Sequence, residues 1–167
     1  DKVGEIFSSV APKYDLMNDA MSFGMHRLWK RYLIKLAGIK PNQHICDLAS
    51  GTGDVALLLT RELGDTGGKV VMSDINKEML DIGYDKIFDA GLSRVVEPVV
   101  ANSECLPFAS SSFDLVTMVF GLRNITDKKR ALSEMHRIVK PGGTVLVMEF
   151  SKPKNSFVSY VYDKYSF

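Results

Sequence analysis

The sequence lacks an excess of charge of either sign. Its 167 residues carry 21 basic and 20 acidic side chains, a formal net charge of +1. No basic tail or basic run is present, so the composition gives no electrostatic basis for binding nucleic acid or an anionic surface. The expected partners are therefore neutral or small molecules, with no nucleic acid among them.

Cysteine is scarce, and long apolar runs are missing. The two cysteines are Cys46, inside an apolar run, and Cys105; this usage suits reduced thiols better than a disulfide framework. No apolar stretch approaches the ~20 residues that span a bilayer, and no signal peptide is expected. The three histidines have no metal-ligand spacing, so no metal is expected. With 46% apolar residues, the chain is predicted to be one soluble cytoplasmic domain.

The apolar periodicity predicts helices that alternate with strands. Helical periods cover residues 25–37, 54–63, 76–91 and 127–139, and further helices are expected within 1–23 and at 155–166. Strand patterns cover 44–48, 69–74, 95–100, 113–120 and 144–150. Pro98 places the third strand at a sheet edge, because proline has no N–H for a ladder hydrogen bond. Pro141-Gly142-Gly143 is expected to turn the chain before the fifth strand.

This alternation predicts parallel strands joined by right-handed helical crossovers. The fold class is therefore α/β, an open and mostly parallel doubly wound sheet of Rossmann-like type. Ligands bind such sheets beyond the carboxyl ends of the strands, beside strand one. The glycine loop after Asp47, the strand end Asp74, Asn102 and residues 119–124 all follow strands. They should therefore converge on one crevice.

A glycine loop follows the first predicted strand. Gly51 and Gly53 leave room for a ligand to approach the backbone at a helix N-terminus. Gly51-x-Gly53-x-x-Ala56, with Asp74 about 20 residues later, fits a permissive dinucleotide fingerprint whose carboxylate binds ribose hydroxyls. A nicotinamide dinucleotide and S-adenosylmethionine both remain open on this pattern.

The acidic end of the first strand favours S-adenosylmethionine. Asp47 and three further residues precede Gly51, and a carboxylate there would repel a pyrophosphate but suit the cationic amino group of an amino acid. We expect Asp47 to orient that group, and Gly51, Thr52 and Gly53 to line the methionine portion. Asp74 is expected to accept hydrogen bonds from the ribose, with a helix N-cap as its structural alternative.

Two long segments resemble the signatures of the ubiquinone/menaquinone biosynthesis C-methyltransferases. The first is Tyr14-Asp15-Leu16-Met17-Asn18 with Met21-Ser22, His26 and Trp29, and the second is Arg137-Ile138-Val139-Lys140-Pro141-Gly142-Gly143, continuing to Glu149-Phe150-Ser151. Phe120-Gly121-Leu122-Arg123-Asn124-Ile125-Thr126-Asp127 and Ala101-Asn102-Ser103-Glu104 with Leu106-Pro107-Phe108 are similar to further family segments. The resemblance covers residues 1–167, and one departure is Ser50, where the family usually has glycine.

The resemblance implies a class I methyltransferase domain with S-adenosylmethionine as cofactor. Residues 1–38 would be an N-terminal helical cap on the substrate side and residues 39–167 the core. Family members continue with segments that complete the sheet, so the chain is expected to be truncated at its C-terminus. Asn102 and Ser103 match positions that contact the adenine. Val119 matches another cofactor position, although a buried strand residue describes it almost as well.

The family segment at the end of the fourth strand supplies the catalytic candidates Arg123 and Asn124. Arginine stays protonated, so we expect Arg123 to stabilise a phenolate or organise a catalytic water; an ion pair with Asp127 is the structural alternative. Tyr14 and His26 are further candidates. His26 could relay a proton near neutral pH, but a packed histidine is the more common outcome on an apolar helix.

The function that follows is methyl transfer to a ring carbon of a prenylated benzoquinol or naphthoquinol in quinone biosynthesis. Two alternatives remain open: a class I methyltransferase with another small-molecule acceptor, and a cofactor-binding scaffold in a quinone-synthesis complex. A nicotinamide-dependent oxidoreductase is the poorest fit, because no hydride acceptor site can be located. A lipid substrate also implies peripheral contact with an inner membrane, and a homodimer or a quinone-synthesis complex is left open.

Overall fold

The computed structural model describes residues 25–150. Several sequence predictions fall on other residues and lie outside the described part of the chain. These are the helix within 1–23, the candidate Tyr14 and the helix at 155–166. The expected N-terminal cap, residues 1–38, is described only from residue 25 onward.

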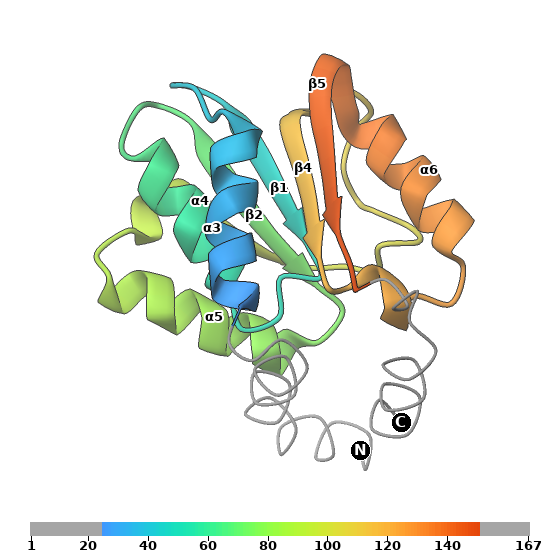
Figure 1. Cartoon of the computed structure of the whole chain (residues 1–167), viewed down its shortest axis with the longest axis horizontal. Coiled ribbons are helices and arrows are strands. Elements are labelled where there is room, and N and C mark those ends of the chain that lie inside the picture. Colours follow the sequence, from blue (N-terminus) through green and yellow to red (C-terminus); the bar gives the residue numbers. More distant parts are fainter. Residues whose placement is uncertain (1–24, 151–167) are drawn as a thin grey trace.

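A parallel sheet of five strands forms the centre of the described chain, in the order β3-β2-β1-β4-β5 (Figure 1). The strands are β1 (His44–Leu48), β2 (Lys69–Asp74), β3 (Val96–Val100), β4 (Phe113–Val119) and β5 (Val139–Met148). The strand order reverses between β1 and β4, which confirms the predicted doubly wound topology and its switch point beside strand one. β3 is an edge strand, so the placement of Pro98 at an edge is also confirmed.

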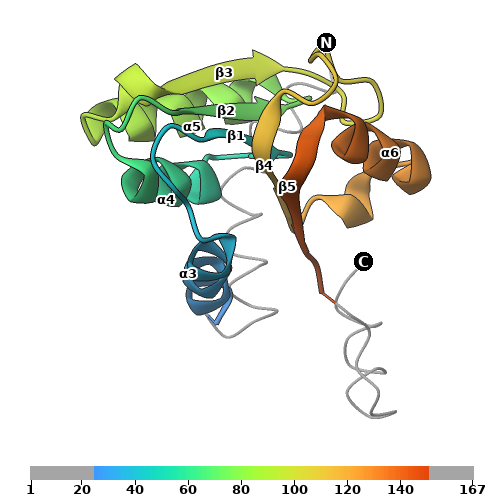
Figure 2. The same cartoon turned by 90° about the horizontal axis from the view of Figure 1, so that it is seen from above.

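Helices cover both faces of the sheet. They are α3 (His26–Ala37), α4 (Asp54–Leu63), α5 (Lys77–Asp89) and α6 (Lys128–Ile138), with short 3-10 turns η1 (Ser93–Val95) and η2 (Leu122–Asn124). Neighbouring residues of a strand point to opposite faces. Ile45 of β1 therefore joins the core beneath α3, α4 and α5, whereas Cys46 joins the core beneath α6. Figure 2 shows α3 and α4 on one side of the strands and α6 on the other.

The connection from β3 to β4 contains no helix. Residues 101–112 cross between the strands as a loop with one isolated bridge, from Asn102 to Cys105. The expectation of a helical crossover between successive strands is therefore wrong here. Leu106 of this loop is buried and packs into the core beneath α6. The loop thus covers part of the sheet face that a helix would otherwise occupy.

β5 begins before the turn that was expected to precede it. Phe113 pairs with Val139, but Leu115 pairs with Thr144. The intervening Pro141-Gly142-Gly143 is accommodated as an irregularity inside the strand, and Gly142 adopts a φ of 78° there. The predicted start of the fifth strand at residue 144 is therefore wrong by several residues, although its pairing with β4 is regular from Thr144 onward.

Candidate functional site

A cavity of about 750 Å³ opens beyond the carboxyl ends of β1, β2 and β4. Most of the residues predicted to form the site line this cavity: Asp47, Gly51, Thr52, Asp74, Asn102, Ser103, Val119, Arg123 and Asn124. Gly53 and His26 are not among its lining residues, and Tyr14 lies outside the described residues. Strand topology therefore brings side chains from four segments of the chain to one place.

Asp47 is a fully buried carboxylate at the end of β1. Its Oδ1 accepts a hydrogen bond of 2.6 Å from the hydroxyl of Thr117 on the neighbouring strand β4. Its Oδ2 has no hydrogen-bond partner among the described residues. Burial raises the pKa of Asp47 from 3.8 to about 7, although the Thr117 hydrogen bond acts in the opposite direction. One oxygen of this carboxylate therefore needs a donor or a cation.

Asp74, at the end of β2, holds the glycine loop in place. Its Oδ2 accepts a hydrogen bond of 2.8 Å from the backbone N–H of Gly51, and its Oδ1 accepts one of 2.9 Å from the N–H of Asn76. Asn76, rather than Asp74, caps α5 by accepting a hydrogen bond from the N–H of Met79. A carboxylate oxygen has two acceptor sites. Each oxygen of Asp74 can therefore still accept a hydroxyl from a ligand.

Ser50, the departure from the usual glycine, ties the loop to β2. Its hydroxyl donates to the carbonyl of Asp47 at 2.7 Å and accepts from the N–H of Ser73 at 3.1 Å. The backbone N–H of Ser50 also donates to the carbonyl of Ser73 at 3.0 Å. The hydroxyl of Ser50 therefore has partners on β1 and β2 and adds no unsatisfied group to the site.

Gly53 lies where α4 packs closely against α5. It adopts a φ of 77°, and a Cβ there would lie 2.8 Å from the Cα of Gly83 on α5. The two glycines let the start of α4 approach α5 closely. The close approach of the two helices accounts for a glycine at this position. Contact of Gly53 with the methionine portion stays a prediction.

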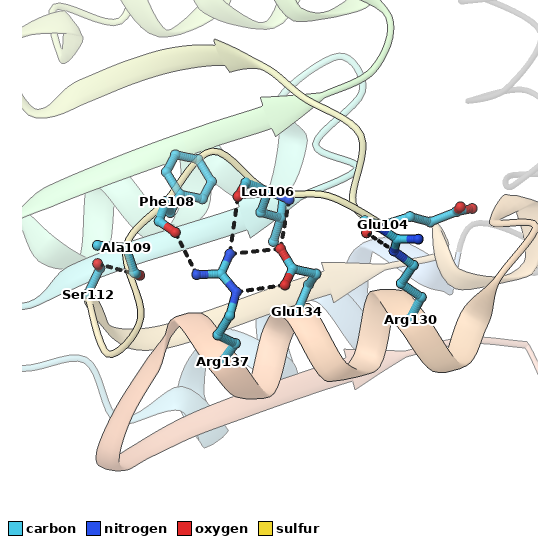
Figure 3. Close-up of polar contacts among 8 residues, drawn as sticks. All are labelled: Glu104, Leu106, Phe108, Ala109, Ser112, Arg130, Glu134 and Arg137. Carbon is cyan, nitrogen blue, oxygen red and sulfur yellow. Dashed lines mark hydrogen bonds and ion pairs between the residues drawn. The ribbon is translucent and has the colours of Figure 1, made fainter.

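The loop that carries Asn102 and Ser103 is fixed to α6 by an arginine network (Figure 3). Arg137 donates to Glu134 through Nε and Nη2 at 2.6 and 2.7 Å, and to the carbonyls of Phe108 and Leu106 at 2.7 and 3.1 Å. Glu134 in turn accepts from the N–H of Leu106 at 2.8 Å. The pKa of Glu134 falls to about 2, chiefly because of the hydrogen bonds from Arg137. Arg137 therefore positions this loop without lining the cavity.

Arg123 lies in η2, directly after β4, and is held by Glu149. Its backbone N–H donates to Glu149 Oε2 at 3.1 Å, and its Nη1 lies 3.2 Å from Oε1. The carboxylate of Asp127 accepts a hydrogen bond from the N–H of Arg130 and caps α6. The sequence offered an ion pair of Arg123 with Asp127 as the structural alternative. In the structure Arg123 forms an ion pair with Glu149 instead.

Two stacked aromatic rings lie beside the guanidinium of Arg123. The rings of Phe120 and Phe150 stack with centroids 4.4 Å apart, and the Arg123 Cζ lies 5.9 and 5.2 Å from them. Trp29 of α3 meets Phe150 edge-on at 6.0 Å. Phe120 has a φ of 56°, a left-handed conformation that a bulky residue adopts only under constraint. Arg123 and Phe120 both line this end of the cavity, which therefore combines a cation with a flat apolar ring.

Three residues at or beside the cavity were not predicted from the sequence as site residues: Lys30, Glu149 and Phe120. Lys30 lines the cavity from α3, four residues after the buried His26, which the structure explains as a packed residue at 2% exposure. The helical spacing of Lys30 and His26 was a signal that both share one face of α3. Glu149 was noted only as part of a family signature, and nothing in the sequence pairs it with Arg123.

Comparison with known proteins gives a consistent result over the whole chain. A profile of the ubiE/COQ5 methyltransferase family matches residues 1–167. Two relatives are named ubiquinone/menaquinone biosynthesis C-methyltransferase UbiE. The one from Pseudoalteromonas translucida is 52% identical to this chain over 165 residues, and the one from Pseudomonas fluorescens strain SBW25 is 52% identical over 167 residues. These matches cover 99% and 100% of this chain. The chain spans 65% of the length of each relative.

Solved structures support the fold. A SAM-dependent methyltransferase from Aquifex aeolicus matches with a TM-score of 0.68 at 23% identity, over 76% of this chain and 66% of that one. The [4+2]-cyclase SpnF matches with a TM-score of 0.67 at 25% identity, over 75% of this chain and 46% of that one. One of these two proteins is a cyclase, so the fold by itself does not assign a reaction.

Proposed function

Because the chain belongs to the ubiE/COQ5 methyltransferase family, we propose that it binds S-adenosylmethionine and transfers a methyl group to a ring carbon of a prenylated quinol. The observation that carries the proposal is the buried Oδ2 of Asp47, which lacks a partner among the described residues in the wall of the cavity. A buried carboxylate oxygen without a partner is unfavourable. The cationic amino group of an amino acid would satisfy it.

The remaining lining residues fit the rest of this cofactor. Asp74 retains acceptor sites for ribose hydroxyls, because its hydrogen bonds with Gly51 and Asn76 use one site on each oxygen. Asn102 and Ser103 lie at the next strand end and would face the adenine, with Val119 as an apolar contact. When bound, S-adenosylmethionine supplies an electrophilic methyl carbon attached to a sulfonium. The protein contributes the positioning of the two reactants in the cavity.

The Arg123 end of the cavity suits an aromatic acceptor. A quinol carbon becomes nucleophilic when its neighbouring hydroxyl is deprotonated or donates a strong hydrogen bond to a base, and the ring proton leaves after methylation. Arg123 would stabilise the phenolate oxygen, because guanidinium remains protonated and donates hydrogen bonds in a fixed geometry. Phe120 offers a flat apolar wall to the ring, and Asn124 adds an amide. Tyr14 stays a further catalytic candidate predicted from the sequence.

A prenylated substrate requires access to a membrane surface, and the outer face of α3 fits that role. Met25, Leu28, Tyr32 and Leu36 are exposed there, and Arg31 and Lys35 are exposed beside them. Apolar side chains flanked by basic ones are typical of helices that lie on anionic membranes. No helix within residues 25–150 is long and apolar enough to cross a bilayer. Flotation with anionic and neutral vesicles tests this surface, with Leu28→Glu expected to reduce the bound fraction.

Two measurements test the proposed reaction. Calorimetry with S-adenosylmethionine and S-adenosylhomocysteine tests cofactor binding, and failure of both to bind would exclude the proposal. Methyl transfer to benzoquinol and naphthoquinol acceptors then identifies the substrate. If Arg123→Ala binds cofactor normally and keeps full transfer activity, the assigned role of Arg123 is wrong. A cofactor-binding scaffold would show normal binding and no transfer to any acceptor.

A further inference from the structure

Lys30 brings a buried positive charge to the same cavity as Asp47. It lies on α3, its side chain is 9% exposed, and its Nζ is 3.0 Å from Oδ2 of Asp54, the first residue of α4. Lysine is rarely buried unless its ammonium has partners. The described residues give Lys30 a hydrogen bond with Asp54, whereas an ammonium group has three N–H donors. The cavity wall therefore holds a cation with donors to spare.

The carboxylate of Asp54 is shared between two lysines. Lys86 of α5 lies 3.3 Å from its Oδ1, so two ammonium groups face one carboxylate. Although partial burial opposes them, these lysines lower the pKa of Asp54. Lys86 does not line the cavity, whereas Lys30 does. Because Asp54 shares its negative charge between two lysines, it neutralises Lys30 only in part.

The cavity thus presents charges of opposite sign at the end of β1. Asp47 provides a carboxylate oxygen with no partner among the described residues, and Lys30 provides an ammonium group on the facing helix. This pair of charges matches a zwitterion such as an α-amino acid, which carries an ammonium and a carboxylate on the same carbon. A simple cation would use Asp47 and leave Lys30 facing it unfavourably, and a simple anion would do the reverse.

We propose that Lys30 binds the carboxylate of the amino-acid end of the cofactor, opposite Asp47, which receives its ammonium. This inference rests on the proposed function, because S-adenosylmethionine carries both groups. It also gives α3 a part in cofactor binding, since the same ammonium joins α3 to α4 through Asp54. The simpler explanation is that Lys30 only fastens α3 to α4.

Two ligands that differ only in the carboxylate separate these explanations. S-adenosylmethionine and decarboxylated S-adenosylmethionine share the adenosine, the sulfonium and the ammonium. Their dissociation constants are measured by calorimetry at pH 7 for the wild-type chain and for Lys30→Met. We expect the wild type to prefer S-adenosylmethionine by 10-fold or more, the scale of a hydrogen bond between charged groups. Lys30→Met should bind the two ligands within 2-fold of each other.

Lys86→Met is the matched control. It removes the other ammonium from Asp54 but leaves the cavity wall unchanged, so it should keep the wild-type preference for the carboxylate. Lys30→Arg, which keeps the charge, should retain part of the preference. If Lys30→Met keeps the full wild-type preference, the proposal is wrong and Lys30 is structural. If the wild-type chain binds neither ligand, the proposed function itself fails, which is a different result.

Discussion

Glu149 holds Arg123 at two points, one on the backbone and one on the side chain. It accepts from the Arg123 N–H at 3.1 Å, and its Oε1 lies 3.2 Å from the guanidinium Nη1. Oε1 also accepts from the N–H of Phe150 at 2.9 Å. The side chains of Arg123 and Glu149 are only 25% and 21% exposed, so water screens the pair weakly. The end of β5 therefore fixes the cation at the end of β4.

Replacing Glu149 by glutamine should slow methyl transfer without weakening cofactor binding. The amide oxygen can still accept one N–H, but the negative charge that orients the guanidinium is lost. We expect kcat to fall about 10-fold, the scale of one charge-assisted hydrogen bond. The Kd for S-adenosylhomocysteine should stay within about 2-fold. Transfer of a labelled methyl group and calorimetry measure the two quantities.

Asp114→Asn is the matched control for Glu149→Gln. Asp114 also accepts a backbone N–H, from His44 at 2.8 Å, and pairs with a lysine, Lys140, at 2.9 Å. It does not line the cavity, so its substitution should change neither kcat nor Kd. A loss of activity equal to that of Glu149→Gln would show that the effect is a general loss of structure.

The sheet was predictable because its strands carry their own signals. The apolar runs ending in Asp47 and Asp74 gave strand bounds 44–48 and 69–74 that the structure reproduces. The loop at 101–112 was harder, because its burial depends on contacts with α6 through Arg137 and not on local periodicity. The start of β5 was missed because Pro141-Gly142-Gly143 indicates a turn locally, whereas pairing of Val139 with Phe113 extends the strand.

The cavity was predictable in outline, and its charge pairs were not. Residues at strand ends converge for topological reasons, so Asp47, Asp74 and Asn102 could be placed together from sequence. Lys30 reaches the cavity from a helix whose docking depends on side-chain packing. Glu149 meets Arg123 only because β4 and β5 are neighbours in register. A single sequence contains neither of these distances.

The two glycines of the loop should respond differently to alanine. Gly53→Ala combines a φ of 77° with a Cβ 2.8 Å from the backbone of Gly83, which cannot move away without shifting α5. Gly51→Ala has a φ of 53°, but its Cβ would meet the flexible end of Met79 at 3.2 Å. Left-handed backbone costs about 1–2 kcal/mol in either case. We expect Gly53→Ala to lose more stability in urea denaturation, by roughly a further 1–3 kcal/mol.

Cofactor affinity provides the second measurement for these variants. Because Gly53 does not line the cavity, folded Gly53→Ala should bind S-adenosylhomocysteine within about 3-fold of the wild type. Gly51→Ala, at the cavity wall, should bind more weakly than Gly53→Ala. If Gly53→Ala bound S-adenosylhomocysteine more weakly than Gly51→Ala, Gly53 would belong to the cofactor site and the packing role would be contradicted.

Glu134 should contribute stability that disappears in acid. Its pKa is 4.5 ordinarily and about 2 in the folded chain, so the folded state binds fewer protons than the unfolded state between these values. The contribution is therefore complete above about pH 4.5 and is lost as the pH falls toward 2. Glu134→Gln should lower Tm by a few degrees at pH 7, and the difference from wild type should shrink below about pH 4.5. A difference that stays constant from pH 7 to pH 3 would contradict this role.

Asp47 should reduce the stability of the free protein at neutral pH. Its folded pKa of about 7 lies above the ordinary 3.8, so the unfolded state loses its proton first and stability falls as pH rises between these values. The loss reaches at most about 4 kcal/mol above pH 7. Asp47→Asn cannot ionise and should have a higher Tm than wild type at pH 8, with the gap closing toward pH 4. It should also bind S-adenosylmethionine at least 10-fold more weakly.

Binding of S-adenosylmethionine should expel the proton from Asp47. At pH 6.5 the free protein holds much of this carboxylate protonated, since its pKa is about 7, whereas a cationic ammonium beside it favours the ionised form. Calorimetry in phosphate and in a buffer of larger ionisation enthalpy should therefore show net proton release on binding. Near pH 8.5 Asp47 is already ionised, and the α-amino group of the ligand, with an ordinary pKa of about 8, should instead take up a proton. The sign of the proton flux should reverse between the two pH values.

Two controls test whether the proton comes from Asp47. Asp47→Asn should abolish the release at pH 6.5, and 5′-methylthioadenosine, which lacks the amino-acid group, should release no proton from the wild type. Release that persists in Asp47→Asn would assign the proton to another group and remove Asp47 from the ammonium site.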